Sequence, residues 1–184
     1  MDLRVERTKR NIKEAFLKLR IEKPLEKITV KELAELAFIN KATFYSHYKD
    51  IYDLSEQLEN EIVDSIIEKL PSSEKLLFNP RENARQMALA ISSQQEIIDT
   101  LFSGNRAAFL EHKLEVNLGR TICDHYPELK EDLQGKIILS MLVHGGFYIF
   151  NQYGEKYDVK EIIKTVGDIN ECLVENFIKV SPEQ

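Results

Sequence analysis

The amino-acid sequence predicts an all-α protein, and three observations support this fold class. Apolar residues recur every three or four positions along most of the 184-residue chain, which is the spacing of a helix face. No run of alternating apolar and polar residues between turn residues indicates a strand. Hydrophobic residues make up 43% of the chain, which is ample for a folded core.

The first expected helix ends at Lys23-Pro24, because a helix is disfavoured at the residue before a proline. Its inward stripe consists of Ile12, Ala15, Phe16 and Leu19. A long fourth helix is expected from near Asp50 to just before Pro71, and its length suggests a connector between an N-terminal head and a C-terminal body. The apolar residues that mark this helix are Leu54, Leu58, Ile62 and Ile66.

Residues 29–48 are expected to form two short helices joined by a tight turn. Thr29 can cap the first helix, with Glu32 three residues later as in a capping box. Phe38-Ile39 interrupts the pattern, and Asn40 suits the N-cap of a second helix that runs from Lys41 to about Tyr48. The inner face of the first short helix would be Leu33, Ala34, Leu36 and Ala37. This arrangement predicts a helix-turn-helix.

In the second short helix, Phe44 and Tyr48 are four residues apart and are expected to point inward. Small, polar and basic residues remain for its outer surface, and such a surface suits the major groove of DNA. These residues are Lys41, Ala42, Thr43, Tyr45, Ser46 and His47.

This segment, continued to Leu54, resembles the DNA-binding signature of the TetR family of transcriptional regulators. The resemblance covers about the first quarter of the chain. One departure is Ile51, which stands where the family usually has a lysine. The residues that match the family pattern are Thr43, Phe44, Tyr45, His47, Tyr48, Lys49 and Leu54.

The resemblance implies a dimeric, ligand-responsive regulator, most often a repressor. Residues 1–49 would form the helix-turn-helix domain, and residues 50–184 a helical domain for effector binding and dimerisation. Lys41 reading a guanine is the most natural base contact. Phosphate contacts are expected from Thr43, Tyr45, His47 and Lys49, base contacts from Asn40, Lys41, Ala42 and Ser46, and a further DNA contact from Thr29. For His47, packing within the head is the alternative.

Charge is unevenly distributed along the chain, whose net charge is −6. Residues 1–50 hold 12 Lys and Arg against 8 Asp and Glu, and residues 51–184 hold 13 against 23. A basic head attracts phosphate, and an acidic body limits non-specific affinity for DNA. Ordinary solvated helix faces would produce the same counts, so charge alone leaves both interpretations open.

The sequence predicts a soluble, cytoplasmic protein. No apolar run follows the N-terminal charges, and no stretch reaches the roughly 18 uncharged apolar residues of a membrane span. Cys123 and Cys172 lie far apart without a CxxC, which argues against a disulfide framework or a zinc finger.

The body is expected to begin with a loop at residues 72–79, with Pro80 as the first residue of the next helix. The apolar pattern of that helix would continue to Gly104 through Met87, Leu89, Ala90, Ile91, Ile97, Ile98, Leu101 and Phe102. A second pattern would run to Tyr126-Pro127 through Ala108, Phe109, His112, Val116 and Ile122, and another helix would start around Pro127-Glu128.

The last two helices predict a dimer interface. Residues 137–150 are apolar almost all round, so both faces of this helix need cover. Residues 160–178 carry the apolar stripe Ile162, Val166, Ile169, Leu173 and Phe177, widened by Ile163, Val174 and Ile178. Pairing both helices with a second subunit would form a four-helix bundle, with Gly145-Gly146 permitting close approach. A central helix within a monomer is the alternative interpretation, and Gly145-Gly146 could instead mark a kink or a ligand pressed on the backbone.

A small, largely apolar effector is expected between the body helices, although aromatic residues and Met at helical spacing are more often core residues. The candidate contacts are Met87, Phe102, Phe109, His112, Tyr126, His144 and Tyr148.

No residues assemble a convincing catalytic set, and neither a cofactor nor a metal is expected. Cys123, His125 and His112 could hold a soft metal if their helices converge, but a structural histidine beside a free cysteine is the simpler interpretation. Two other functions remain open: a DNA-binding activator or adaptor switched by a partner protein, and a small helical enzyme.

Overall fold

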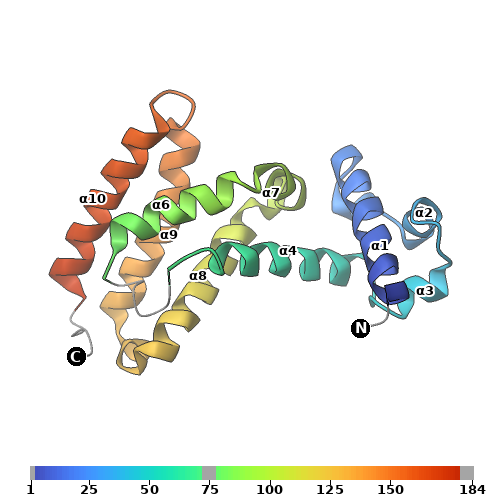
Figure 1. The fold of residues 1–184 in the computed structure, drawn as a ribbon, viewed down its shortest axis with the longest axis horizontal. Helices are drawn as coiled ribbons and strands as arrows, with labels where there is room; N and C mark the ends of the chain where they lie inside the picture. The colour runs from blue at the N-terminus through green and yellow to red at the C-terminus, as the bar shows by residue number, and fades with distance from the viewer. Residues whose placement is uncertain (1–2, 72–77, 179–184) are drawn as a thin grey trace. The chain divides into compact units, whose positions relative to one another are not determined.

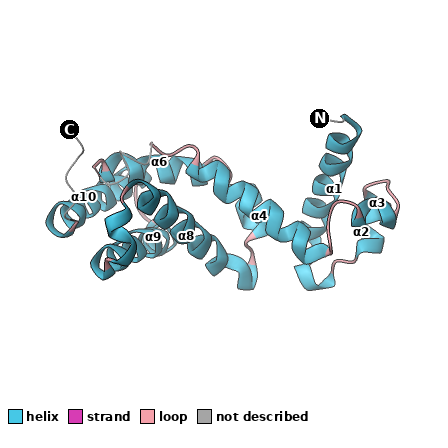
Figure 2. Cartoon of the chain, turned by 90° about the horizontal axis from the view of Figure 1, so that it is seen from below, coloured by secondary structure: helices cyan, strands magenta, loops and turns pink. Residues whose placement is uncertain are grey.

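The computed structural model describes residues 3–71 and 78–178, and these residues form helices, turns and loops without any strand (Figure 2). The all-α prediction is confirmed. The chain divides into two compact units. Unit 1 consists of Met1–Ile62 and Gln95–Arg106, and unit 2 consists of Val63–Gln94 and Ala107–Gln184.

Unit 1 is built around α1, which packs against α2 and α7, while α2 packs against α3 (Figure 1). Its elements are α1 (Leu3–Glu22), η1 (Leu25–Lys27), α2 (Val30–Leu36), α3 (Lys41–Tyr45), the first part of α4 (Ile51–Ile67), α7 (Gln95–Leu101) and η2 (Gly104–Arg106). The apolar stripes predicted for the first and fourth helices are confirmed, because all eight of their residues are buried. The predicted ends of both helices are also confirmed, since α1 stops at Glu22 before Lys23-Pro24 and α4 stops before Pro71.

A buried ionic network explains why residues 95–106 belong to unit 1. Glu59 is fully buried on α4 and accepts hydrogen bonds from Arg106 Nε at 2.8 Å and Arg106 Nη2 at 2.7 Å. Ser55 donates a third bond to the same carboxylate at 2.8 Å. On α1, the buried Arg20 donates to Ser103 Oγ at 3.0 Å. Unit 1 therefore extends past the expected boundary at residue 49, because these contacts join segments that are distant in the sequence.

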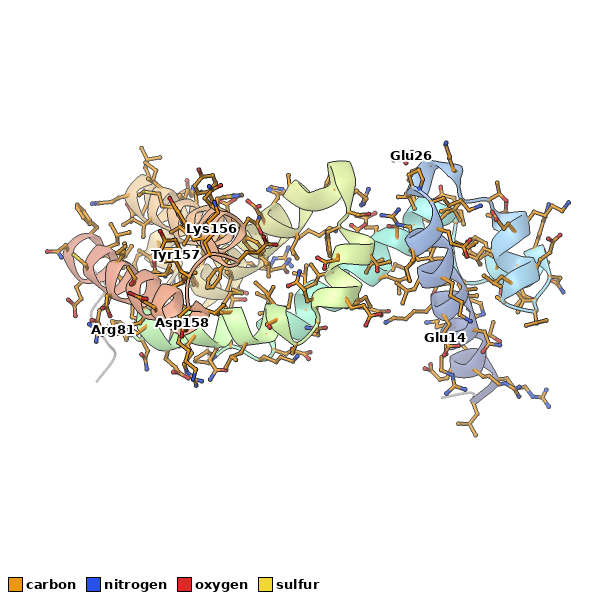
Figure 3. All side chains as sticks on the ribbon, turned by 90° about the horizontal axis from the view of Figure 1, so that it is seen from above. Glu14, Glu26, Arg81, Lys156, Tyr157 and Asp158 are labelled. Carbon is orange, nitrogen blue, oxygen red and sulfur yellow. The ribbon has the colours of Figure 1, made fainter. Side chains whose placement is uncertain are left out.

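Unit 2 consists of the end of α4, α6 (Pro80–Ser92), α8 (Ala107–His125), η3 (Pro127–Glu131), α9 (Leu133–Tyr153) and α10 (Val159–Phe177). α10 packs against α6 and α9, and α8 packs against α9 (Figure 1). The helices α6 and α10 come close together at Gly167, where a Cβ atom would lie 3.1 Å from Arg81 Cα. Arg81, labelled on α6 in Figure 3, adds ion pairs to Asp168 at 3.0 Å and Glu171 at 2.7 Å on α10.

Three sequence-based expectations for the body are wrong. The helix that starts at Pro80 as predicted ends at Ser92, and α7 begins at Gln95, so the break precedes Gly104. Residues 127–131 form a 3-10 helix, and the next α-helix starts at Leu133 behind the N-cap Asp132. The predicted inner stripe of α8 is out of phase, since Phe109 and Val116 are 47% and 43% exposed while Leu110, Leu114 and Leu118 are buried. Both sets of residues have helical spacing, so periodicity could not choose between them.

Most of the predicted loop at residues 72–79 lies outside the described residues.

The predicted helices at residues 137–150 and 160–178 correspond to α9 and α10. Within one chain, α9 stays largely uncovered, and its exposed apolar residues include Leu133, Ile137, Met141 and Tyr148. The α10 stripe is split: Ile162, Val166 and Val174 are buried, whereas Ile169 and Phe177 are about half exposed. A Cβ added at Gly145 or Gly146 would meet no atom within 4 Å.

By length and composition, α9 could cross a membrane. One such helix is weak evidence, because core helices of soluble proteins meet the same criteria.

Candidate nucleic-acid interface

The first helix of the predicted helix-turn-helix begins as the sequence indicates. Thr29 Oγ1 accepts a hydrogen bond from the Glu32 backbone N–H at 3.3 Å, so Thr29 is confirmed as the N-cap of α2. The Glu32 carboxylate accepts from Lys23 Nζ at 2.5 Å instead of completing a capping box. Glu32 thus ties the start of α2 to the end of α1.

The turn after α2 is a Schellman motif. Phe38 N donates to Glu35 O at 3.3 Å, and Ile39 N donates to Ala34 O at 3.0 Å. This geometry places Phe38 in the left-handed region with φ 55°, and no other non-glycine residue in the described part of the chain has a positive φ. The conformation costs about 1–2 kcal/mol for a residue with a Cβ. The Phe38 side chain is 93% exposed, so there is no hydrophobic burial of the ring to offset that cost.

Asn40 is confirmed as the N-cap of α3. Its Oδ1 accepts from Thr43 N at 2.7 Å and from Thr43 Oγ1 at 3.0 Å. The helix was expected to end near Tyr48, but it ends at Tyr45. Its last turn tightens, because both His47 N and Tyr48 N donate to Phe44 O.

Two inward aromatic side chains hold α3 in unit 1. Phe44 is fully buried, Tyr48 is 6% exposed, and their ring centroids lie 5.6 Å apart. On α2 the expected inner face is confirmed at Leu33, Ala34 and Ala37. It is wrong at Leu36, which is 40% exposed.

Most of the predicted DNA contacts are exposed on one short segment, residues 40–49. Lys41 and Tyr45 lie four residues apart on α3 and so share one face. The predicted contacts that are exposed are Thr29, Asn40, Lys41, Ala42, Tyr45, Ser46 and Lys49, while Thr43 and His47 are half-buried. The segment therefore presents two ammonium groups, a phenol and a methyl group outward.

Three polar side chains of this set are already hydrogen-bonded within the segment. Thr43 uses its hydroxyl proton on Asn40, and Ser46 Oγ donates to Thr43 O at 2.7 Å. Asn40 Oδ1 uses both lone pairs on Thr43, so it cannot also accept from an adenine amino group. These residues stabilise the segment, and they have fewer groups left for bases or phosphates than the sequence suggested.

The backbone around Lys49 is fixed by the start of α4. Asp50 Oδ1 accepts from Asp53 N, and Asp53 Oδ2 accepts from Lys49 N, both at 2.8 Å. The Lys49 N–H and the Gln57 side chain hold the pKa of Asp53 below its usual value. Ile51, at the position where a lysine was expected from the resemblance, is buried and supplies packing but no charge.

The predicted effector contacts are divided between the two units. Phe102 is buried in unit 1, whereas the other six residues belong to unit 2. Tyr126 is buried and packs edge-on against Phe78 and His125, and Met87 is half-buried. Phe109, His112 and Tyr148 are exposed. An effector pocket stays a prediction.

A polar cluster in unit 2 was missed by the sequence analysis. His144 Nδ1 lies 2.7 Å from Glu111 Oε2, and His144 Nε2 lies 3.0 Å from Glu115 Oε2. Ser140 also donates to Glu115. The available signal was spacing, since Glu111 and Glu115 on α8, and Ser140 and His144 on α9, are both pairs four residues apart.

Hydrogen bonds to the two carboxylates raise the pKa of His144, and bonds from Ser140 and His144 lower the pKa of Glu115. The cluster is suited to hold an imidazolium between carboxylates. It is not a nucleophile-base pair, because Ser140 donates to the carboxylate and not to the imidazole. Among the residues that the structure describes, no group of three or more His, Cys, Asp and Glu side chains could hold a metal ion.

Comparison of the chain with protein-family models, with curated proteins and with solved structures finds no match. The resemblance of residues 29–54 to the TetR family therefore remains an interpretation of those residues.

The His144 cluster predicts a pH-dependent stability. Because the pKa of His144 is raised in the folded state, its stabilisation is complete below the usual value of 6.5 and is lost as pH rises through the folded-state pKa. The difference in unfolding free energy between the wild type and His144→Gln should shrink as the pH is raised above 6.5, through the folded-state pKa. Urea denaturation at several pH values measures it. His47→Gln, in unit 1, is the control, and an equal difference at every pH value would contradict the prediction.

Proposed function

We propose that this protein is a sequence-specific, DNA-binding transcriptional regulator of the TetR type, acting as a repressor that a small ligand releases from its operator. The observation that carries the proposal is the short helix α3. It packs against α2, buries Phe44 and exposes Lys41, Ala42 and Tyr45 on its outer side. A helix of this kind, entered from a tight turn, is suited to lie in a major groove.

The donors on this segment divide into two roles. Lys41 is at the first position of α3, where side chains reach base edges, and its ammonium group can donate to guanine O6 and N7. Thr29, Tyr45, His47 and Lys49 would donate to phosphates on either side. Thr43 and Asn40 would act mainly by fixing the backbone of α3, since their polar atoms are engaged with each other.

The exposed apolar side of α9 and α10 supports a homodimer. Large apolar side chains of both helices are exposed in the single chain, and Gly145 and Gly146 leave room for a close helix approach. A two-fold interface between these helices would cover the exposed side chains and would place two heads on one DNA duplex.

A DNA-binding activator or adaptor switched by a partner protein is the second candidate. The observation that favours it is the scatter of the predicted effector contacts, of which Phe109, His112 and Tyr148 are exposed. Exposed residues suit a protein partner better than an enclosed ligand.

The direct test of the proposal is selection of bound duplexes from a random DNA pool. A pseudo-palindromic consensus, with half-sites about one helical turn or a small multiple apart, would support a dimeric operator-binding protein. Recovery of unrelated sequences with no enrichment would overturn the proposal.

The two exposed lysines should behave differently on the selected duplex. Lys49→Ala should weaken binding to all duplexes alike, and in each subunit it should reduce the slope of log affinity against log salt by about 0.9 for every phosphate that is no longer neutralised. Lys41→Ala should relax preference at one base per half-site, at a cost of about 1–3 kcal/mol. Fluorescence anisotropy on specific and random duplexes measures both effects.

Lys130→Ala, at an exposed lysine of η3, is the control for both variants. Equal losses on specific and random DNA for Lys41→Ala would remove it from the base-reading role.

The proposed interface predicts that a charge on the exposed side of α9 separates the subunits. Met141→Asp introduces a carboxylate at a residue that is 54% exposed in the single chain, so the fold of one subunit should survive. Sedimentation should show a dimer for the wild type and a monomer for the variant, and affinity for the two-half-site duplex should fall with it. Leu89→Asp, at a residue 49% exposed on α6, should remain dimeric. A monomeric wild type at micromolar concentration would contradict the interface.

The two switching modes separate in a ligand screen. An apolar or aromatic effector should raise the melting temperature of the protein and lower its DNA affinity, by a coupling of typically about 1–3 kcal/mol. Thermal shift identifies binders, and a DNA-release titration with each binder measures the coupling. Binders that leave DNA affinity unchanged would favour the candidate switched by a partner protein.

A further inference from the structure

We infer that Phe38, in the turn between α2 and α3, is a specificity-determining DNA contact that reads a thymine methyl group in each half-site. The inference rests on the proposed DNA-binding function and extends it to a residue outside the predicted contact set. Three independent observations carry it: the backbone conformation of Phe38, its exposure, and the way the neighbouring polar groups are already used.

The conformation at residue 38 is imposed by the turn. The two backbone bonds of the Schellman motif, Phe38 N to Glu35 O and Ile39 N to Ala34 O, require a left-handed residue between α2 and α3. Glycine adopts this conformation without steric strain, and Asn tolerates it better than most residues. Phe38 adopts it with φ 55°, so folding of the turn alone would favour another residue type.

Packing does not account for the aromatic ring either. Phe38 is 93% exposed, the highest exposure among the large apolar side chains of the part of the chain that the structure describes. A ring that is strained at its backbone and left in water contributes nothing to the unit 1 core. Backbone strain of this kind is found where a side chain acts on a ligand.

The location of Phe38 identifies the ligand as duplex DNA. Phe38 lies two residues before the N-cap Asn40 and three before the exposed Lys41, on the same turn that delivers α3. The two backbone bonds that fix the turn also fix the Cα of Phe38 relative to α2. An exposed aromatic group beside a lysine suits the major groove, whose walls are anionic and whose floor carries thymine methyl groups.

The hydrogen bonds already made within the segment leave fewer of its polar groups to read bases. Asn40 cannot pair with adenine in the usual bidentate manner, and the hydroxyl protons of Thr43 and Ser46 are committed to the segment itself. Lys41 alone recognises one guanine. Methyl contacts can add discrimination at the neighbouring base pairs, and the Phe38 ring is the largest exposed apolar group next to α3.

The experiment compares Phe38→Gly with the wild type on the duplex selected from the random pool, and on duplexes in which each thymine in turn is replaced by deoxyuridine. Deoxyuridine removes only the C5-methyl group. For the wild type, one position per half-site should lose about fourfold in affinity, the value expected for one buried methyl group. Phe38→Gly should bind the thymine duplex more weakly and should show no loss at that position.

Phe38→Gly should also raise the melting temperature by a few degrees, because glycine relieves the left-handed strain. If the variant is more stable yet binds DNA more weakly, Phe38 acts as a DNA contact and not as a structural residue. Phe38→Asn, which tolerates the left-handed conformation but lacks the apolar ring, should bind as Phe38→Gly does. Tyr157→Ala, an exposed aromatic residue labelled between α9 and α10 in Figure 3, is the matched control and should bind as the wild type does.

Two outcomes are distinguishable. If the wild type enriches no DNA sequence, the proposed function fails. If the wild type selects a consensus while Phe38→Gly binds it with unchanged affinity and unchanged deoxyuridine sensitivity, the function stands and this inference is overturned. In the second case the exposed ring would belong to a protein contact.

Discussion

The geometry of the candidate DNA-binding surface depends on one buried ring, that of Phe44. The helix α3 has five residues, far fewer than the roughly 12–15 that an isolated helix needs in water. Ordering five residues costs roughly 1–2 kcal/mol each, whereas burial of one such ring contributes about 1.5–3 kcal/mol. The remainder must come from the Asn40 cap, from the bonds that Thr43 and Ser46 make within the segment, and from Tyr48 beside the ring. Polar groups that could have contacted DNA are thus used to build the helix that we propose contacts it.

The buried ionic network gives unit 1 a second dependence, on a segment far along the chain. Glu59 has no exposed surface, and removing a partner from a buried ion pair costs about 3–5 kcal/mol because a charge is left uncompensated. Residues 95–106 are therefore firmly part of unit 1, while the helices on either side of them, α6 and α8, are part of unit 2. The chain crosses from one unit to the other at three places: within α4 after Ile62, after Gln94, and after Arg106. The helices α6 and α8 are thus connected to unit 1 through the chain directly, in addition to the connection through α4.

The parts of the structure that could be predicted from the sequence are those decided by local chemistry. Thr29 and Asn40 cap their helices because their side chains bond the backbone three residues on, and Lys23-Pro24 ends α1 by local sterics. The phase of α8 could not be predicted, because Leu110 and His112 belong to two stripes of equal period. Prediction of the His144 cluster would have required the register of α8 against α9, which brings together Ser140 and Glu115, 25 positions apart in the sequence. Prediction of the extent of unit 1 would have required the ion pair of Glu59 and Arg106, which are 47 residues apart. In the candidate site itself, the exposed residues were predicted, but their internal hydrogen bonds and the left-handed Phe38 depend on turn geometry that composition does not reveal.

The uncovered helix α9 raises the question of what kind of surface covers it. The helix is apolar enough for lipid, yet His144, bonded to two carboxylates of α8, lies on the same helix as Met141 and Tyr148. Ionisable groups inside a bilayer are costly even when paired, and hydrogen bonds to Glu111 and Glu115 raise the pKa of His144, which favours its charged form. A protein surface can cover both the exposed apolar stripe of α9 and the His144 cluster, because it offers apolar side chains to the stripe and polar groups or water to the cluster. A second copy of α9 offers both, since a two-fold interface places the same surface on both sides. The charged cluster therefore favours a protein partner over lipid as the cover for this helix.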